Sequence, residues 1–305
     1  MNAPQRHRLL AGWFLCGLAL ALVALPQIAL AAEPAASEAT AETAATSSPE
    51  LCVLTFNLRY ASATPPNAWS ARRPAAKALW DRVQPDVVGT QEGVYQQIKN
   101  IAADQPDFAW IGLGREGGSR GEFMAIFYRR DRLTPLEFDH FWLSDTPEVI
   151  GSTTWGNSNR RMVTWVKFRD QQADRDFYFF NTHFDHQVQT AREQSAALLL
   201  SRIEGLKTRQ PIIVTGDFNA PAERGTVYER LVNPQALVDT WTVAKERGPA
   251  IGTFHNYGGP REGGARIDWI LCRGPLAVER AEVITDKLGD QYPSDHFPVL
   301  ARLRW

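Results

Sequence analysis

Short apolar runs alternate with longer amphipathic segments along the chain from about residue 51 onward. The runs are four to six residues long and rich in Val, Ile, Phe, Tyr and Trp, which favours strands buried on both faces. We predict strands at 53–56, 86–89, 124–128, 164–168, 177–181, 212–215, 267–272 and 299–303. The amphipathic segments predict helices at 72–83, 94–103 and 190–206. Mixed strands and helices with many turn residues predict an α+β layered fold.

The first 31 residues have the layout of an export signal. Arg6 and Arg8 precede an apolar run from Leu9 to about Leu30, and small residues near its end suit a signal peptidase. We therefore expect cleavage before Ala32 and a secreted or periplasmic protein without stable membrane insertion. An uncleaved anchor helix is the alternative, because the run approaches the roughly 20 residues that span a bilayer.

Residues 32–50 are predicted to be a linker, because they contain almost only Ala, Glu, Ser, Thr and Pro. Residues 51–305 then form one large domain, which we expect to act as a monomer. Residues 1–50 hold two of the 33 Lys and Arg residues and four of the 34 Asp and Glu residues, which leaves 31 against 30 in the domain. This balance disfavours a protein that holds duplex DNA through its phosphates.

Two cysteines of the domain, Cys52 and Cys272, lie inside apolar strands. Export would permit a disulfide between them, and two buried free thiols are the alternative. An apolar strand is a poor setting for a thiolate, so catalysis by cysteine is disfavoured.

Polar side chains capable of chemistry follow directly after several predicted strands, where catalytic residues are commonly carried. They are Asn57, Glu92, His183, Asp217, Asn219, Asp295 and His296, with Asp268 inside a strand. Such a recurrence favours one shared site over a set of independent turns.

Asp217 and Asn219 follow the strand at 212–215 and lie on one side of it, since side chains alternate along a strand. A carboxylate beside an amide can orient a water and donate a hydrogen bond to a phosphoryl oxygen. An Asx turn that closes the strand is the alternative. Asp295 and His296 can together bind a metal and accept a proton, with Asp268 fixing the imidazole tautomer. A solvated turn is the alternative there.

Glu92 is the first-choice ligand for Mg²⁺, which prefers carboxylate oxygen and keeps several waters. Asn57 either supports that ligand, contacts the phosphate, or forms a turn. His183 could protonate or hydrogen-bond a leaving phosphate oxygen, with Glu122 orienting it, although each alone is more often structural. We interpret Asp185 and His186 as loop residues with a small chance of substrate contact.

Taken in order, this set resembles the endonuclease/exonuclease/phosphatase superfamily (DNase I-like) from Leu51 to Arg302. The segments at 55–60, 69–73 and 141–144 are similar to its small exported bacterial branch. The positions that match family motifs are Asn57, Glu92, Glu122, His183, Asp217, Asn219, Asp268, Asp295 and His296. The resemblance implies a four-layered α/β/β/α sandwich, in which two packed, mixed and mainly antiparallel sheets are flanked by helices.

The resemblance also implies hydrolysis of a phosphodiester or phosphomonoester by inline attack of water, with Mg²⁺, or Mn²⁺ or Ca²⁺ as substitutes. The metal would lie at Glu92, helped by Asp295 and Asn57. The catalytic group would be completed by His296 with Asp268 behind it as the base, Asp217 placing the water, and His183 and Asn219 stabilising the pentavalent charge.

Arg59 and Arg161 are candidate phosphate clamps, because arginine offers paired donors, although either could be a surface charge. The aromatic side chains of Trp69, Trp142, Trp155 and His255 could line a substrate pocket or simply pack. We expect a small or lipid-linked phosphate ester as substrate. An extracellular nuclease is the nearest alternative, and a catalytically silent binding module on the same scaffold is the alternative of another class.

Overall fold

The computed structural model describes residues 49–305. The predicted export signal (1–31) and nearly all of the predicted linker (32–50) lie outside the described residues. Glu50, placed in the linker by the sequence, instead belongs to the first strand and pairs with Arg304. None of the described helices combines the length and the apolar character that a membrane span requires.

Two large sheets form the centre of the described domain. The seven-stranded sheet contains β1 (Glu50–Asn57), β2 (Val87–Gln91), β4 (Phe108–Ile111), β6 (Ile126–Arg129), β12 (Glu246–Arg247), β14 (Ala277–Val283) and β15 (Val299–Arg304). The six-stranded sheet contains β7 (Leu133–Trp142), β8 (Met162–Asp170), β9 (Arg175–His183), β10 (Ile212–Asp217), β11 (Val238–Asp239) and β13 (Asp268–Arg273). Their strand orders are β12-β14-β15-β1-β2-β6-β4 and β11-β13-β10-β9-β8-β7. The pairs β1–β2, β9–β10 and β12–β14 are parallel and the other neighbours are antiparallel, while β3 (Gly93–Val94) and β5 (Glu122–Phe123) form a small separate ladder.

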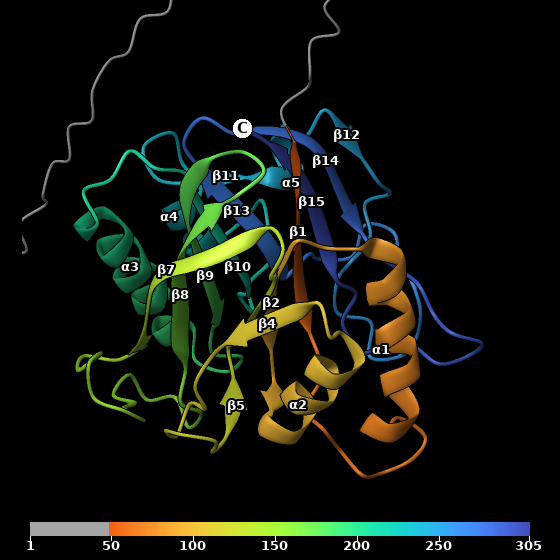
Figure 1. Cartoon of the computed structure of the whole chain (residues 1–305). Helices are drawn as coiled ribbons and strands as arrows, with labels where there is room; N and C mark the ends of the chain where they lie inside the picture. The colour runs from red at the N-terminus through yellow and green to blue at the C-terminus, as the bar shows by residue number, and fades with distance from the viewer. Residues whose placement is uncertain (1–48) are drawn as a thin grey trace, which may run out of the picture. The chain divides into compact units, whose positions relative to one another are not determined.

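Helices cover the outer faces of both sheets (Figure 1). The seven-stranded sheet carries α1 (Trp69–Val83) and α2 (Tyr95–Asp104), whose apolar side chains share a core cluster with β1 and β2. The six-stranded sheet carries α3 (Gln189–Gly205) and α4 (Thr226–Leu231), which pack on β9, β10 and β13. A single turn, α5 (Thr240–Val243), contacts β13 and β14.

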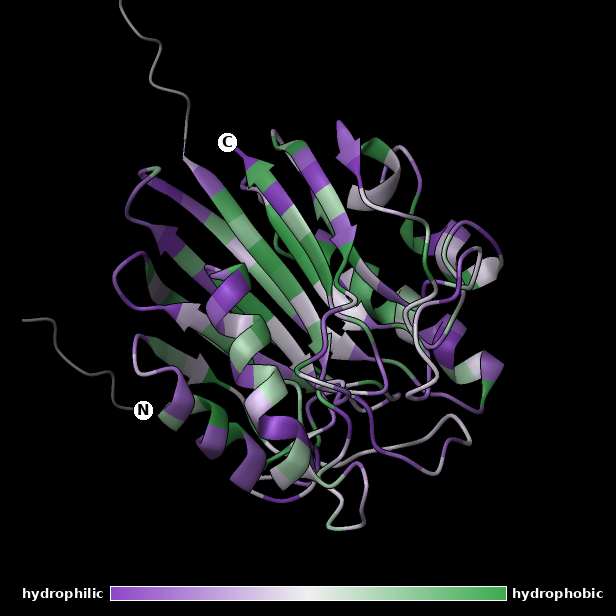
Figure 2. Ribbon diagram, turned by 90° about the vertical axis from the view of Figure 1, so that its right-hand side faces the viewer, coloured by the Kyte–Doolittle hydropathy of each residue, from purple (hydrophilic) through white to green (hydrophobic). Residues whose placement is uncertain are grey.

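Side-chain alternation along the strands explains why the layers form. On β1, Val53 enters the core between the sheets, while Leu54 faces the cluster beneath α1. On β9, Phe179 enters the same central core and Phe180 faces α3. Hydrophobic positions accordingly concentrate along the strands in Figure 2. Both faces of each central strand are therefore buried, which confirms the predicted α+β four-layered sandwich.

All eight predicted strands and all three predicted helices are present, with ends shifted by a few residues. The longest strand that the sequence missed is β7, an edge strand whose middle is largely exposed. Its side chains include Leu136 and Phe138 beside charged neighbours, so no continuous apolar run marked it. Cys52 and Cys272 are both buried and free, which supports the thiol alternative.

Candidate active site

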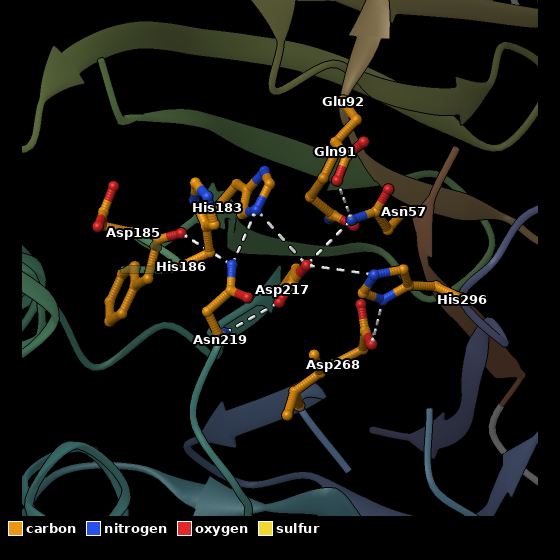
Figure 3. Close-up of polar contacts among 12 residues, drawn as sticks. Asn57, Gln91, Glu92, His183, Asp185, His186, Asp217, Asn219, Asp268 and His296 are labelled. Atoms are coloured by element: carbon orange, nitrogen blue, oxygen red, sulfur yellow. Dashed lines mark hydrogen bonds and ion pairs between the residues drawn. The ribbon is translucent and has the colours of Figure 1, made fainter. Parts of the chain in front are cut away.

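Strand register brings polar residues of both sheets to one end of the sandwich. Asp217, the last residue of β10, pairs with His183 on β9 and with Asp268 on β13. In the other sheet Asn57 ends β1 beside the end of β2, and Glu92 follows directly. Side chains that are far apart in the sequence therefore meet at one place (Figure 3).

Asn57 connects two of the acidic side chains. Its Nδ2 donates to Glu92 Oε1 at 3.0 Å and to Asp217 Oδ2 at 2.9 Å. The backbone N–H of Tyr60 donates to the other oxygen of Glu92 at 2.9 Å. One ligand atom each from Glu92, Asp217 and His296 lie within 4.8 Å of one another. Such a spacing allows one divalent cation to contact all three residues.

His296 has an acidic partner on one side and faces the cluster on the other. Its Nδ1 lies 2.9 Å from Asp268 Oδ2, and its Nε2 lies 3.9 Å from Asp217 Oδ2. Burial alone would lower the pKa of His296, but the charge and hydrogen bond of Asp268, with Asp217 adding to them, raise it to about 10. The imidazole therefore favours its positively charged form.

Negative charge exceeds positive charge around this imidazole. Burial, and then the neighbouring Asp268, raise the pKa of Asp217 to about 7, and burial also raises the pKa of Asp295. Burial opposes ionisation of Glu92 as well, but the hydrogen bond from Asn57 and further favourable contacts lower its pKa. A buried excess of carboxylate oxygens beside an imidazole is a donor set that fits a hard divalent cation.

Only one of the three predicted metal ligands belongs to the cluster of Glu92, Asp217 and His296. Glu92 belongs to it, whereas Asn57 donates its amide N–H groups to the cluster's carboxylates. The Asp295 carboxylate is not among the three clustered groups and lies 3.4 Å from Arg59. The structure thus places Asp217 and His296 beside the cation site, and the ligand role of Asp295 stays a prediction.

The cluster lies in an open cleft of ≈ 480 Å³. The predicted site residues that line it are Arg59, Glu92, Glu122, Arg161, His183, Asp217, Asn219, Asp295 and His296. Asn57 and Asp268 do not line the cleft, but each forms a hydrogen bond with a residue that does. The cleft therefore gathers the predicted set, while the catalytic role of each member stays a prediction.

Three backbone positions at the cleft adopt left-handed conformations that cost non-glycine residues about 1 kcal/mol each. Glu92 has φ 61°, Asn219 has φ 47° and Arg59 has φ 55°. Hydrogen bonds hold two of these turns, because Asp217 Oδ1 accepts from the Asn219 N–H and Asn57 Oδ1 accepts from the Arg59 N–H. Such conformations cluster at functional sites, where the surroundings impose them.

The predicted pairing of Glu122 with His183 is replaced by a different arrangement. Glu122 lies 2.7 Å from Arg115, and it is Arg161 whose Nη1 lies 3.0 Å from His183 Nδ1. Arg161 therefore stands between the two groups, 4.0 Å from Glu122. Burial, and then the charge of Arg161, hold the pKa of His183 well below its usual value. On its other side His183 Nε2 lies 3.0 Å from Asn219 Nδ2.

A buried arginine of α1, within the segment 69–73 that resembles the exported bacterial branch, holds the rim of the site in place. Arg72 is fully buried and donates to the carbonyls of Leu58, Arg59 and Pro293 at 2.6 to 3.0 Å. The first two belong to the loop after β1, whose Tyr60 N–H holds Glu92. Pro293 directly precedes the segment with Asp295 and His296. One guanidinium therefore fixes two loops of the cleft.

The aromatic residues proposed for the pocket pack elsewhere. The Trp69, Trp142 and Trp155 indoles donate to Asn100, to the Arg115 carbonyl and to Asp145, and the His255 ring stacks on Phe297 at 3.7 Å. None of the four is among the described residues that line the cleft. Their sequence context left pocket lining and packing open, and the structure supports packing for all four.

Other cleft residues were missed. The lining residues that were not predicted are Tyr60, Arg115, Asn159, Phe254 and Ile267, whereas His186, which was given a small chance of substrate contact, also lines the cleft. Tyr60 and Phe254 are about half exposed. Arg115 offered a signal, because it lies in a glycine-rich loop shortly after an apolar strand, whereas no pattern marked the two exposed aromatic side chains.

Comparison with known proteins gives consistent matches. The sequence model of the endonuclease/exonuclease/phosphatase family matches residues 54–296. The structure is similar to an endonuclease/exonuclease/phosphatase from Bacteroides vulgatus, with 32% identity and a TM-score of 0.79 over 84% of this chain and 99% of that one. It is equally similar to a mannosyl-6-phosphatase from Bacteroides thetaiotaomicron, with 33% identity and a TM-score of 0.79 over 84% of this chain and 100% of that one.

Two more distant matches carry less weight. TDP2 from D. rerio, in complex with a single-stranded DNA product, has 16% identity and a TM-score of 0.67 over 84% of this chain and 99% of that one, which shows the fold alone. An uncharacterised protein of Acanthamoeba polyphaga mimivirus is 29% identical over 161 residues. That alignment covers 50% of this chain and 59% of the viral protein.

Proposed function

This chain belongs to the endonuclease/exonuclease/phosphatase family, and we propose that it is a divalent-metal-dependent phosphoesterase acting on a small, hydroxyl-rich phosphate ester such as a sugar phosphate. The observation that carries the proposal is the convergence of Glu92, Asp217 and His296 within 4.8 Å in an open cleft. An acidic cluster of this kind suits the hydrolysis of phosphate esters, in which charge on the phosphoryl group must be neutralised.

Glu92 would hold the cation at the cluster, beside Asp217 and His296, and when bound it would neutralise charge on the phosphoryl and leaving oxygens. The pair Asp217 Oδ2 and His296 Nε2, 3.9 Å apart, receives the proton of the attacking water. We assign this proton to the pair because the charge of each group shifts the pKa of the other. The water oxygen forms the new bond to phosphorus as the bond to the leaving oxygen breaks, and the leaving oxygen takes a proton from solvent water. Asp268 holds the imidazole in place and stabilises its positive charge.

Donor groups lie directly beside the acidic cluster. His183 Nε2 and Asn219 Nδ2 lie 3.0 Å apart, and both are near Asp217, at the place where the phosphoryl group would bind. Donors arranged in advance around developing charge are worth about 10²–10³ in rate each. Arg59 is about half exposed, so it can turn from Asp295 toward a phosphate.

Three observations support a small substrate. The cleft of ≈ 480 Å³ suits a single sugar phosphate. The sequence at 51–305 is nearly neutral, which disfavours tight binding of a long polyanion. A mannosyl-6-phosphatase is 33% identical along 84% of this chain. The predicted nuclease and the silent binding module are the alternatives that an experiment must separate.

The proposal is tested by incubating purified protein and Mg²⁺ with hexose 6-phosphates, a chromogenic phosphodiester, phospholipid vesicles and plasmid DNA. We expect the fastest turnover on a sugar phosphate and loss of that turnover with EDTA and in His296→Ala. Faster degradation of DNA, with a steep salt dependence, would replace the proposal by the nuclease. Tight binding without turnover, unchanged in His296→Ala, would replace it by the binding module.

A further inference from the structure

Arg161 makes an unusual double contact with two imidazole rings. Its Nη1 lies 3.0 Å from His183 Nδ1, and its Nη2 lies 3.1 Å from His186 Nδ1. A guanidinium has only N–H donors and keeps its charge in proteins. Both Nδ1 atoms must therefore accept hydrogen bonds, and in each neutral ring the proton is on Nε2.

Acidic neighbours keep Arg161 in this position. Its side chain is 5% exposed, with Asp185 Oδ2 3.7 Å from Nε and Glu122 Oε2 4.0 Å from Nη1. Arg115 also pairs with Glu122 at 2.7 Å, so this wall holds two guanidiniums and two carboxylates. Asp185 is itself fixed by backbone N–H groups that donate to its Oδ1. The contact of Arg161 with the two rings is thus part of a charge-balanced, buried group.

This arrangement determines whether the His183 ring can donate a hydrogen bond or release a proton to a substrate. A carboxylate on Nδ1 would favour an imidazolium, which can release a proton to a leaving oxygen. A guanidinium 3.0 Å away does the opposite, because two positive charges repel. The neutral Nε2–H then lies beside Asn219 Nδ2, a donor that already bonds to the Phe184 carbonyl. The nearest carboxylate oxygen, Asp217 Oδ2, lies 3.5 Å from His183 Nε2, which is longer than a normal hydrogen bond. Two adjacent donors therefore leave room for a shared acceptor, such as a phosphoryl oxygen.

We infer that Arg161 is a positioning residue that directs the ring proton of His183 and of His186 to Nε2, where it can be donated in the cleft. His183 then stabilises charge on the phosphoryl oxygens and does not protonate the leaving group. His186, which also lines the cleft, supplies a second donor. The role in hydrolysis rests on the proposed function, but the tautomers do not, so the two can fail separately.

The tautomers are measured by long-range ¹H–¹⁵N correlation spectra of the histidine-labelled protein, with signals assigned through His183→Gln and His186→Gln. We expect both rings to be neutral with the proton on Nε2 at pH 7. In Arg161→Met at least one of the two rings should no longer be found only as the Nε2–H tautomer. In Arg161→Lys one ring should still be, because a single ammonium replaces the two guanidinium donors that bond to the two rings. The His140 and His296 signals serve as internal controls for folding.

An imidazolium or an Nδ1–H tautomer at His183 in the unaltered protein would overturn the inference, even if the Arg161 variants fail to fold. Unchanged ring signals in a folded Arg161→Met protein would overturn it as well. Neither result depends on whether the protein hydrolyses anything.

The catalytic part is tested by comparing leaving groups. His183→Gln should lower kcat/KM by the same factor, on the order of 10²–10³, for 4-nitrophenyl phosphate and for a sugar phosphate. A much larger loss on the sugar phosphate, whose leaving oxygen needs a proton, would show that His183 is a general acid and would contradict the inference. Absence of turnover by the unaltered protein on both substrates would instead reject the proposed function.

Discussion

Buried charges lie at both ends of the sheet sandwich, and the two groups are arranged in opposite ways. At the end away from the cleft, Arg132 is almost fully buried and donates to both oxygens of Asp170, to Asp86 at 2.8 Å and to the Glu50 carbonyl at 2.6 Å. The two carboxylates also accept backbone N–H groups. Each charged group there has direct partners, and the network connects β1 and β8.

Around His296 at the cleft end, by contrast, Glu92 and Asp217 form no ion pair with an arginine or lysine among the described residues. Glu92, Asp217, Asp268 and Asp295 surround the single imidazole of His296. Asp268 Oδ1 has no hydrogen-bond partner among the described residues. Unpaired buried charge costs several kcal/mol, so a fold rarely keeps it without a use. The comparison teaches that the paired group holds the sheets together, whereas the unpaired group is arranged for a ligand.

The largest expected effect is on catalysis at the unpaired end. His296→Ala removes half of the proton-accepting pair and one neighbour of the cation, so kcat/KM should fall on the order of 10⁴-fold. Steady-state hydrolysis of the best substrate from the panel measures this loss, and circular dichroism checks the fold. A folded variant that keeps a tenth of the activity would show that the unpaired group does not carry the chemistry.

Arg132→Met tests the paired end. The change leaves the Asp170 and Asp86 carboxylates buried without their cation, which should lower the free energy of unfolding by about 3–5 kcal/mol. Urea unfolding measures the loss, while kcat/KM of the folded protein should stay unchanged. A variant of normal stability, or one that is stable but inactive, would contradict the division between the two ends.

Arg72→Met sharpens the comparison, because Arg72 is a fully paired cation at the cleft end. Removing its donors leaves several buried carbonyls unsatisfied, so we expect a loss of about 2 kcal/mol in unfolding free energy. The two loops that it holds carry Glu92 contacts and His296, so kcat/KM should also fall roughly 10²-fold. Arg72→Lys should restore part of both quantities. If Arg72→Met lowered the unfolding free energy but left kcat/KM unchanged, Arg72 would have the same purely structural role as Arg132.

The smallest effect concerns the two thiols. Burial raises the pKa of Cys52 and of Cys272 to about 12, so almost no thiolate forms at pH 8. We expect neither thiol to react with iodoacetamide in the native protein, and both to react after unfolding without reductant, as peptide mass spectrometry would show. Labelling in the native state, or a peptide pair joined by a disulfide, would contradict the structure.

Much of the fold and the membership of the site were predictable from the sequence, because both depend on local patterns. Buried central strands such as β1, β9 and β10 are continuous apolar runs, and their polar ends point to chemistry. The edge strand β7 is half exposed and carries Pro135, so its pattern is mixed. Sequence patterns therefore identify strands that are buried on both faces and overlook those at the edge.

The partners of charged side chains could not be predicted. Glu122 was expected beside His183, but Arg161, which is separated from both in sequence, takes that place. Arg72 reaches the Pro293 carbonyl from the other end of the chain. Long guanidinium side chains choose partners according to the packing of distant loops, and such packing leaves no local pattern. The sequence therefore indicated which residues form the site, but it did not indicate which of their side chains contact one another.

The most direct test of the difference between the two ends is cation binding, measured by titration calorimetry with Mn²⁺ on protein stripped of metals. The unaltered protein should bind one cation at the cluster of Glu92, Asp217 and His296, and Glu92→Gln should weaken that binding at least tenfold. Asp170→Asn, which changes the paired end, should leave the affinity unchanged. Equal affinity in Glu92→Gln and the unaltered protein, or no binding at millimolar Mn²⁺, would contradict the account.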